Sequence, residues 1–268
     1  MIPIIPGYIT LAVLATNLSL AVAVWSIFSS ATEHSDLPPA TRRRIRLGTA
    51  LFLGTWLGAA LVLAPAPASL LDRDPDYLTP LISIFGLAGL TIVLLALRLS
   101  PSLRRVLAAA SLPAMHGVQL FRTLGVVFLI LLAQGLLPAH FALRAGWGDI
   151  AVGITAPLVA FALVRRVRGA VPLSFSWNAL GLLDLVVAIG MGTGFLAPFL
   201  VPELGPRVPP AAAMGVFPLI LVPTFAVPVA VLLHLLALER LRRQVRLRSG
   251  LAPKPADRAS DLASGVAG

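Results

Sequence analysis

Asp184 is the residue in this sequence with the clearest chemical potential, because its carboxylate falls within a long apolar segment. At a helix rise of about 1.5 Å per residue, its expected depth is about two turns, or roughly 10 Å, from the nearer end of that segment. A short carboxylate side chain cannot reach a membrane surface from there, and an ionised one costs on the order of 3 kcal/mol inside a membrane helix. Asp184 is therefore expected to be paired, hydrated in a cavity, or protonated.

Arg122 is the expected partner of Asp184. It lies about one turn inside another apolar segment, at the same end of the predicted bundle, from where its long side chain could reach the surface. A salt bridge that joins two helices is the structural interpretation of this pair. A proton or anion site is the functional interpretation, since ionisable groups inside a membrane are functional candidates by default.

Three further residues are assigned to the same candidate polar core. Gln119 precedes Arg122 by one helical turn, and Trp177 lies on the helix face of Asp184. Asn178 points about 120° away from Asp184, so contact between these two side chains is not required.

His234 completes the core and raises the question of a cofactor. It is expected one turn from the end of its apolar segment, where it could face His116, and two facing histidines can hold haem or a metal ion. Neither has a flanking ligand motif, and hydrogen-bonded histidines at the membrane interface are the favoured interpretation. The chain has no cysteine, which excludes disulfides and thiolate ligands. We predict no cofactor and no metal.

A second polar layer is expected toward the opposite, outer surface, and it consists of Gln134, His140, Arg144 and Asp149. Asp149 would lie in the first turn of a helix, where the helix dipole favours a negative charge, and Arg144 is close enough in sequence to pair with it. Helix capping and anchoring at the interface explain these residues, and a shallow outward-facing site is the alternative.

Seven apolar segments must position these residues. Of the 268 residues, 58% are hydrophobic and only 12% are charged, against about a quarter charged in soluble domains. Each segment is long enough to cross the roughly 30 Å of membrane hydrocarbon. The expected spans are Tyr8–Phe28, Leu47–Pro67, Pro80–Leu97, Val118–Leu137, Trp147–Val164, Trp177–Phe199 and Met214–Leu238. The predicted fold is an all-α integral membrane protein, a bundle of seven transmembrane helices.

Basic residues are concentrated in every second connection between these segments. Seventeen of the 21 lie in the first, third and fifth connections or after the last segment, and only three lie in the others. By the positive-inside rule, the N-terminus is outside and the C-terminus is cytoplasmic, as in a multi-pass protein of a bacterial cytoplasmic membrane. The formal charge of +10 then indicates anionic lipid headgroups as partners, and not nucleic acid.

Local signals add detail to this bundle. Ser100-Pro101 predicts a helix start, followed by a short surface helix. Three prolines of the last segment are expected to kink it and to free backbone carbonyls. Residues 1–248 are assigned to the membrane domain, which ends in a basic interfacial helix, and 249–268 to a disordered tail rich in Pro, Ala, Ser and Asp.

Two functions remain open from the sequence. The first is a protein that handles a small solute or protons through the Arg122 and Asp184 core, as a transporter would, and a water-accessible cavity between the fourth, sixth and seventh segments would favour it. The second is a non-catalytic membrane partner or assembly subunit, in a homo-oligomer or with another membrane protein, whose polar pairs are purely structural. An enzyme is less favoured than either, because the sequence offers no recognisable nucleophile.

Overall fold

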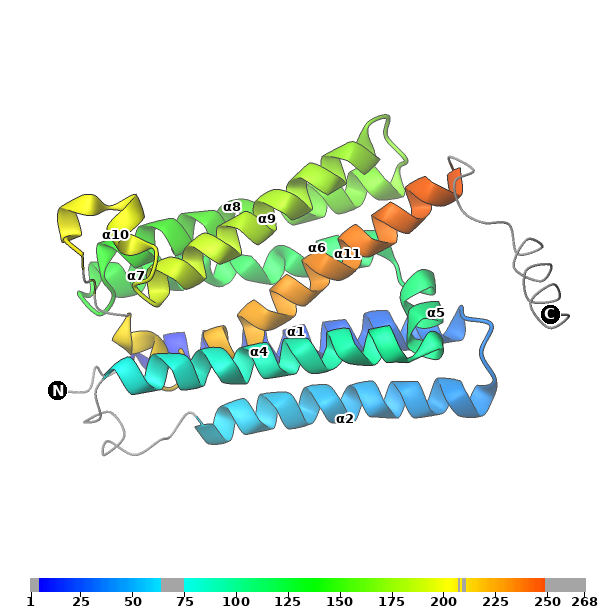
Figure 1. The fold of residues 1–268 in the computed structure, drawn as a ribbon, viewed down its shortest axis with the longest axis horizontal. Coiled ribbons are helices and arrows are strands. Elements are labelled where there is room, and N and C mark those ends of the chain that lie inside the picture. Colours follow the sequence, from blue (N-terminus) through cyan, green and yellow to red (C-terminus); the bar gives the residue numbers. More distant parts are fainter. Residues whose placement is uncertain (1–4, 64–74, 207, 209–210, 249–268) are drawn as a thin grey trace, which may run out of the picture.

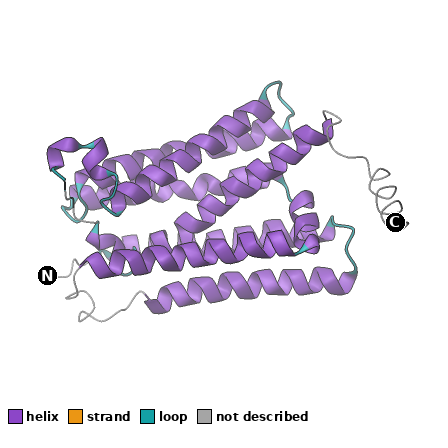
Figure 2. Ribbon diagram, viewed as in Figure 1, coloured by secondary structure: helices purple, strands orange, loops and turns teal. Residues whose placement is uncertain are grey.

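The computed structural model describes residues 5–63, 75–206, 208 and 211–248. Within these residues all regular secondary structure is helical (Figure 2). The elements are α1 (Gly7–Glu33), α2 (Pro39–Leu63), α4 (Pro75–Leu99), α5 (Pro101–Ala109), α6 (Leu112–Gly117), η1 (Val118–Gly125), α7 (Val126–Ala133), α8 (Ala139–Val164), α9 (Ala170–Gly192), α10 (Ala197–Leu200), η2 (Pro202–Leu204), η3 (Ala212–Gly215), η4 (Val222–Ala226) and α11 (Val227–Arg248). The predicted tail, 249–268, lies outside the described residues.

Seven helical segments of the described chain are long and apolar enough to cross a membrane, so the predicted number is confirmed. The second segment begins at Pro39 and not at Leu47, and the boundaries of the last four segments also differ from those expected. The fourth segment covers Leu112–Ala133, the fifth Ala139–Val164, the sixth Ala170–Gly192 and the seventh Val222–Leu247. The fourth, fifth and sixth therefore begin six to eight residues earlier than predicted.

Helix-start signals that hydropathy does not register explain these earlier starts. Ser111 caps the fourth segment, where its hydroxyl oxygen accepts from the Ala114 amide at 3.3 Å. Pro138 precedes the fifth segment. Gly169, with a φ of 87°, makes the left-handed turn that leads into the sixth.

The last helix, α11, is the centre of the bundle. In Figure 1 it runs diagonally between a pair formed by α8 and α9 and a group formed by α1, α2 and α4. It packs against α4, α5, α6 and α9. In the apolar stretch of the seventh membrane segment, which includes most of α11, 67% is buried inside the protein, against 11% in that of the α4 segment. The peripheral helices therefore leave most of their apolar surface exposed.

The entrance to α11 is a broken helix, as its prolines predict. The η4 segment forms a wide π-type turn, and Pro228 follows it in the first turn of α11. Pro228 has no N–H to donate to the carbonyl oxygen of Thr224, four residues before it. The indole Nε1 of Trp56 donates to that oxygen at 3.0 Å, so α2 supplies the missing hydrogen bond.

Two GxxxG spacings in the sequence, Gly54–Gly58 and Gly190–Gly194, are typical of ordinary packing between membrane helices, but in the described part of the chain they do not join one helix to another. An added Cβ would meet no atom within 4 Å at Gly54 or Gly58 of α2. Gly190 of α9 packs against Leu196 in the turn after its own helix, and Gly194 occupies that turn with a φ of 78°. The interpretation as ordinary helix packing is therefore wrong for both pairs.

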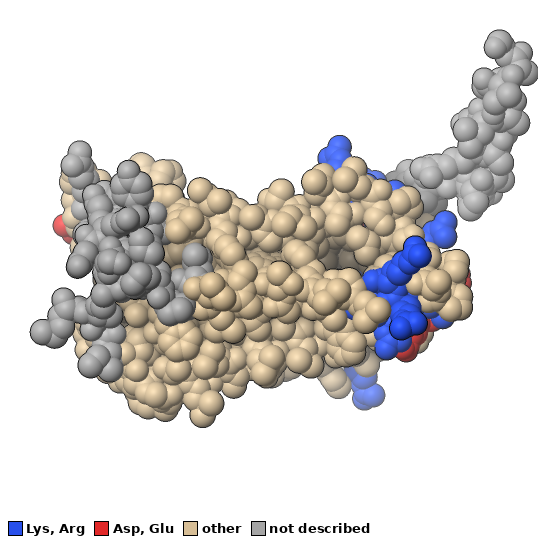
Figure 3. All heavy atoms as spheres, turned by 90° about the horizontal axis from the view of Figure 1, so that it is seen from below, with Lys and Arg blue, Asp and Glu red and all other residues tan. Residues whose placement is uncertain are grey.

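Most of the Lys and Arg side chains visible in Figure 3 lie at one end of the molecule. The short helix α5 is there, capped by Ser100 as expected, with Val106 and Leu107 buried against the core. Arg240 of α11 donates to the carbonyl oxygen of Ala110 just beyond α5. The third connection and the last helix thus meet at this end, as the pattern of basic residues requires.

Candidate functional site: a buried ion-pair cluster beside a cavity

Arg122 is the centre of a buried polar cluster, with 2% of its surface exposed. Its Nε donates to Asp149 Oδ1 at 2.7 Å, and its Nη2 donates to Asp184 Oδ2. Its Nη1 donates to the carbonyl oxygen of Gly181 at 3.4 Å and lies 3.3 Å from His234 Nε2. Every guanidinium nitrogen therefore has an acceptor, which a buried arginine requires. The expected contact between Arg122 and Asp184 is present.

Asp149 belongs to this cluster and not to an outer polar layer. Because α8 begins at Ala139, Asp149 is ten residues inside the helix, about 15 Å from its start. Its predicted pairing with Arg144 is wrong. Arg144 Nη1 instead donates to the carbonyl oxygen of His140, on the preceding turn of the helix.

The cluster also lies deeper than the sequence indicated. Arg122 is ten residues after the first residue of its helical segment and Asp184 fourteen after the first of its own, or about 15 and 21 Å along each helix. Both are therefore near the middle of their segments. The expectation that Arg122 reaches the surface is wrong, since its guanidinium is enclosed by α8, α9 and α11.

A line of hydrogen bonds continues from Arg122 through three buried side chains toward the basic end. His234 Nδ1 lies 2.9 Å from Asn178 Oδ1, and Asn178 Nδ2 lies 2.9 Å from His116 Nε2. The Ser174 hydroxyl also contacts His116 Nε2, at 2.7 Å. Asn178 was not expected to need contact with Asp184, and it joins the cluster indirectly, through His234.

Two backbone carbonyls fix the direction of these hydrogen bonds. His116 Nδ1 faces Leu112 O at 2.8 Å, so this nitrogen carries the hydrogen and Nε2 accepts. Asn178 Nδ2 donates to Ser174 O at 2.7 Å, which orients the amide and directs its oxygen at His234. His234 Nδ1 therefore donates, and its Nε2 accepts from Arg122.

Both histidines are consequently neutral, with all four ring nitrogens occupied, which leaves no nitrogen for haem or a shared metal ion. No group of three or more potential metal ligands occurs in the described part of the chain. The Asn178 amide separates the two rings, and a carboxamide does not readily gain or lose a proton. The line of hydrogen bonds is thus suited to hold Arg122 in place and unsuited to conduct protons between the histidines.

The other predicted core residues occupy supporting positions. Trp177 lies between the two histidine rings, with centroid distances of 5.2 Å to each, and its indole donates to Thr155 on α8. Gln119 does not reach Arg122 or Asp184. Its amide nitrogen donates to Ala230 O of α11, and its buried Oε1 has no hydrogen-bond partner among the described residues.

Two residues of the predicted outer layer lie apart from the cluster. Gln134 Nε2 donates to the hydroxyl of Tyr8 at 2.9 Å, which ties the end of α7 to α1. His140 lies in the first turn of α8, and its buried Nε2 has no hydrogen-bond partner in the part of the chain that the structure describes. The predicted layer is therefore divided: Asp149 is in the cluster, and Gln134, His140 and Arg144 remain near the helix ends.

Glycines allow the helices that carry the cluster to approach closely. A Cβ at Gly148 would overlap the Asp184 carboxylate, and one at Gly181 would overlap the ring of His234. On η1, a Cβ at Gly125 would come within 2.6 Å of the Asp149 Cβ. The 3₁₀ geometry of η1, which carries Arg122, occurs where this segment packs most closely on α8. Irregular helix in the middle of a span often marks a functional position.

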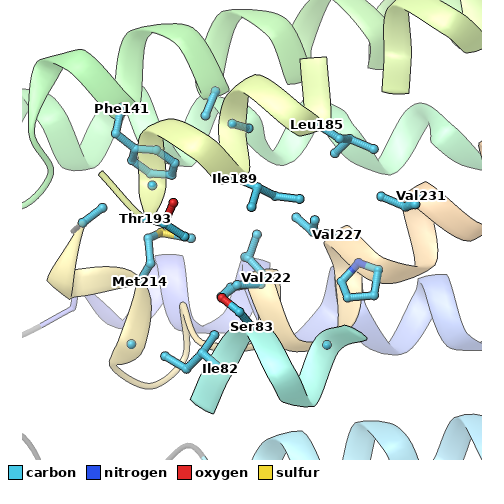
Figure 4. Close-up of a pocket in the computed structure, with 18 of the residues that line it drawn as sticks. Ile82, Ser83, Phe141, Leu185, Ile189, Thr193, Met214, Val222, Val227 and Val231 are labelled. Carbon is cyan, nitrogen blue, oxygen red and sulfur yellow. The ribbon is translucent and has the colours of Figure 1, made fainter. Parts of the chain in front are cut away.

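A cavity of about 250 Å³ adjoins the cluster. Figure 4 shows its walls, formed by Ile82 and Ser83 of α4, Leu185 and Ile189 of α9, and Val227 and Val231 of α11. Among the lining residues that the structure describes, Asp149 is the only charged one. One carboxylate therefore bounds the cavity and binds Arg122.

Hydropathy alone missed the role of Asp149 and the contributions of Ser174 and Thr155. Asp149 was assigned to the wrong depth because the start of its helix was placed eight residues late. The signal that could have corrected it is Pro138, followed by a continuous apolar run with small residues at Gly146 and Gly153.

Comparison with known proteins gives one match. A family model described as a domain of unknown function (DUF8737) matches residues 79–242, a range that contains the whole cluster and the described cavity lining. No curated protein and no solved structure matches the chain. Because the family model covers more than half of the sequence, the chain belongs to the family of this domain of unknown function, DUF8737.

Proposed function

We propose that this protein is a membrane protein that handles a small solute or a proton in the cavity beside Arg122. The observation that carries the proposal is that Asp149 both lines the cavity and pairs with Arg122. A carboxylate with access to a space inside a membrane bundle is a place where charge can be taken up or released.

The charge balance of the cluster supports this proposal. Arg122 contributes one positive charge, Asp149 and Asp184 contribute two negative charges when ionised, and His234 is neutral by its hydrogen bonds. One negative charge is left over. A proton, or the positive group of a solute in the cavity, would neutralise it in a low-dielectric environment where an unbalanced charge is costly.

A structural role for the cluster, in an assembly subunit, is the second candidate. The complete pairing of Arg122 and the close contact of Asp184 with Gly148 favour it, since both would lock α8 and α9 together. The cavity favours the first candidate, because a purely structural ion cluster has no need of an adjoining space of about 250 Å³.

The proposed setting is a cell membrane, with the N-terminus outside and the basic end in the cytoplasm against anionic headgroups. The supporting observation is the position of the basic residues at one end of the bundle. The cavity then lies in the outer half of the bundle, because η3 contributes to its lining and is remote from the basic end in Figure 1.

Infrared spectroscopy of the protein in lipid nanodiscs tests the proposal. Acidification should produce the band of one protonated carboxylic acid inside the protein, and Asp149→Asn should remove that band. Asp36→Asn changes an exposed carboxyl in the α1–α2 connection and is the matched control, expected to leave the band unchanged.

Two outcomes separate the candidates. A band that is lost in Asp149→Asn and kept in Asp36→Asn supports charge uptake at the cavity. A spectrum without this band at every pH at which the protein stays folded would contradict it and leave the structural role as the better account.

A further inference from the structure

We propose that the cavity accepts a membrane-dissolved amphiphile with one positively charged amino group, which enters sideways from the lipid between α4 and α9. This inference rests on the proposed function and adds to it the class of ligand and its route. It follows from the cavity walls, the exposed helices beside them and the excess negative charge of the cluster.

The walls define a ligand that is apolar over most of its length. Within the described part of the chain, Ser83 and Thr193 are the only residues besides Asp149 that bring polar side chains to the lining. A volume of about 250 Å³ is at or below the lower end of the range of roughly 300–1,000 Å³ for small-molecule sites. A single alkyl chain suits this space better than a polar metabolite, which would leave most of its hydrogen bonds unmade.

The route is indicated by residues that line the cavity and are also exposed on the outer surface of the bundle. Leu87 of α4 and Ile189 of α9 line the cavity and are also exposed on the outside, at 59% and 44%. We call this pair the lateral opening. Val227 and Val231 of α11 also line the cavity, and Figure 4 shows them between the labelled residues of α4 and α9.

Residues of η3 and the residue before it line the cavity at its end remote from the basic surface. There Met214 and Gly215 of η3, with Ala211 before them, form part of its lining. The lateral opening, by contrast, is flanked by exposed apolar side chains of helices that are apolar enough to contact lipid. A ligand already dissolved in the bilayer would reach the cavity without crossing a polar surface.

Asp149 supplies the selectivity for a positive head group. Movement of an alkyl chain from lipid into an apolar cavity gives little hydrophobic gain, because both environments exclude water. The free energy that distinguishes one amphiphile from another must then come from the head group. The cluster has one excess negative charge beside the cavity, so it attracts an ammonium group and repels a carboxylate.

Photolabelling of the purified protein in phosphatidylcholine nanodiscs tests the inference. The probe is decylamine with a diazirine at the end of its chain, and the competitors are decylamine, decanol and decanoate at equal membrane concentrations calibrated on empty nanodiscs. Labelled peptides should come from the cavity-lining parts of α4 and α9. Decylamine should compete better than decanoate by about tenfold or more. Asp149→Asn should abolish this difference while decanol still competes.

The route is tested by the rate of labelling after the probe is added in lipid. Leu87→Trp and Ile189→Trp should each slow labelling, because the indole narrows the lateral opening. The matched controls are Ile92→Trp on α4 and Leu180→Trp on α9, which are exposed at 54% and 61% and do not line the cavity. Circular dichroism and elution profile establish that each variant is folded.

The possible failures are distinguishable. Equal competition by decylamine and decanoate in the wild-type protein, with the Asp149 infrared band present, would overturn the ligand class and leave the proposed function standing. Unchanged labelling rates in both tryptophan variants of the lateral opening would overturn the route. Absence of both cavity labelling and the Asp149 band would overturn the inference together with the proposed function.

Discussion

Arg122 has two carboxylate partners, and this changes what removal of a single charge does. After Asp184→Asn, the guanidinium keeps Asp149 as its counter-ion, and the cluster becomes formally neutral. After Arg122→Gln, two carboxylates remain in the interior without a cation. A buried pair broken from one side loses about 3–5 kcal/mol in soluble proteins, because an unpaired charge remains.

Arg122→Gln should therefore destabilise the protein more than Asp184→Asn or Asp149→Asn. The double variant Arg122→Gln/Asp184→Asn should recover only part of the loss, since Asp149 stays unpaired. The triple variant that also contains Asp149→Asn should recover most of it. Thermal unfolding in nanodiscs measures these differences as a mutant cycle. Strictly additive effects would mean that the three side chains do not interact.

At the scale of elements, glycine residues let the helices that carry the cluster pack closely against one another. Gly148→Ala and Gly181→Ala introduce a methyl group into the Asp184 carboxylate and the His234 ring, and overpacking of this kind costs about 1–3 kcal/mol. Gly54→Ala and Gly58→Ala in α2 meet open space, so they should be neutral or stabilising by up to about 1 kcal/mol. Equal losses in all four variants, measured by unfolding in mixed micelles, would contradict this account of the packing.

The link between α2 and the broken seventh helix gives a second test at this scale. Trp56→Phe removes the donor to Thr224 O and should cost about 1 kcal/mol, as membrane hydrogen bonds between helices do. In a Pro228→Ala background the residue at 228 has its own N–H for Thr224 O, so the same substitution at Trp56 should cost less. A mutant cycle on unfolding midpoints checks this, and a coupling energy of zero would show that the indole bond does not replace the one lost at Pro228.

At the scale of the whole molecule, the position of the basic residues predicts the orientation in the membrane. Seventeen of the 21 basic residues belong to connections at one end or to the C-terminal region. A periplasm-active reporter fused after Leu251 should be inactive, and the same reporter fused after Asp74 should be active. The reverse pattern would refute the orientation and would place the cavity in the inner half of the membrane.

The sequence alone determined the number of apolar segments and the clustering of basic residues, because hydropathy and charge along the chain are local properties. It also indicated the contact between Arg122 and Asp184, because a buried charge needs a counter-ion. Only the tertiary structure decided the depth of these residues, which depends on helix starts at Ser111, Pro138 and Gly169. Only the tertiary structure joined Asp149 to Arg122, since that contact requires two helix backbones to meet at glycine, and backbone approach is a property of pairs of helices that no single segment encodes.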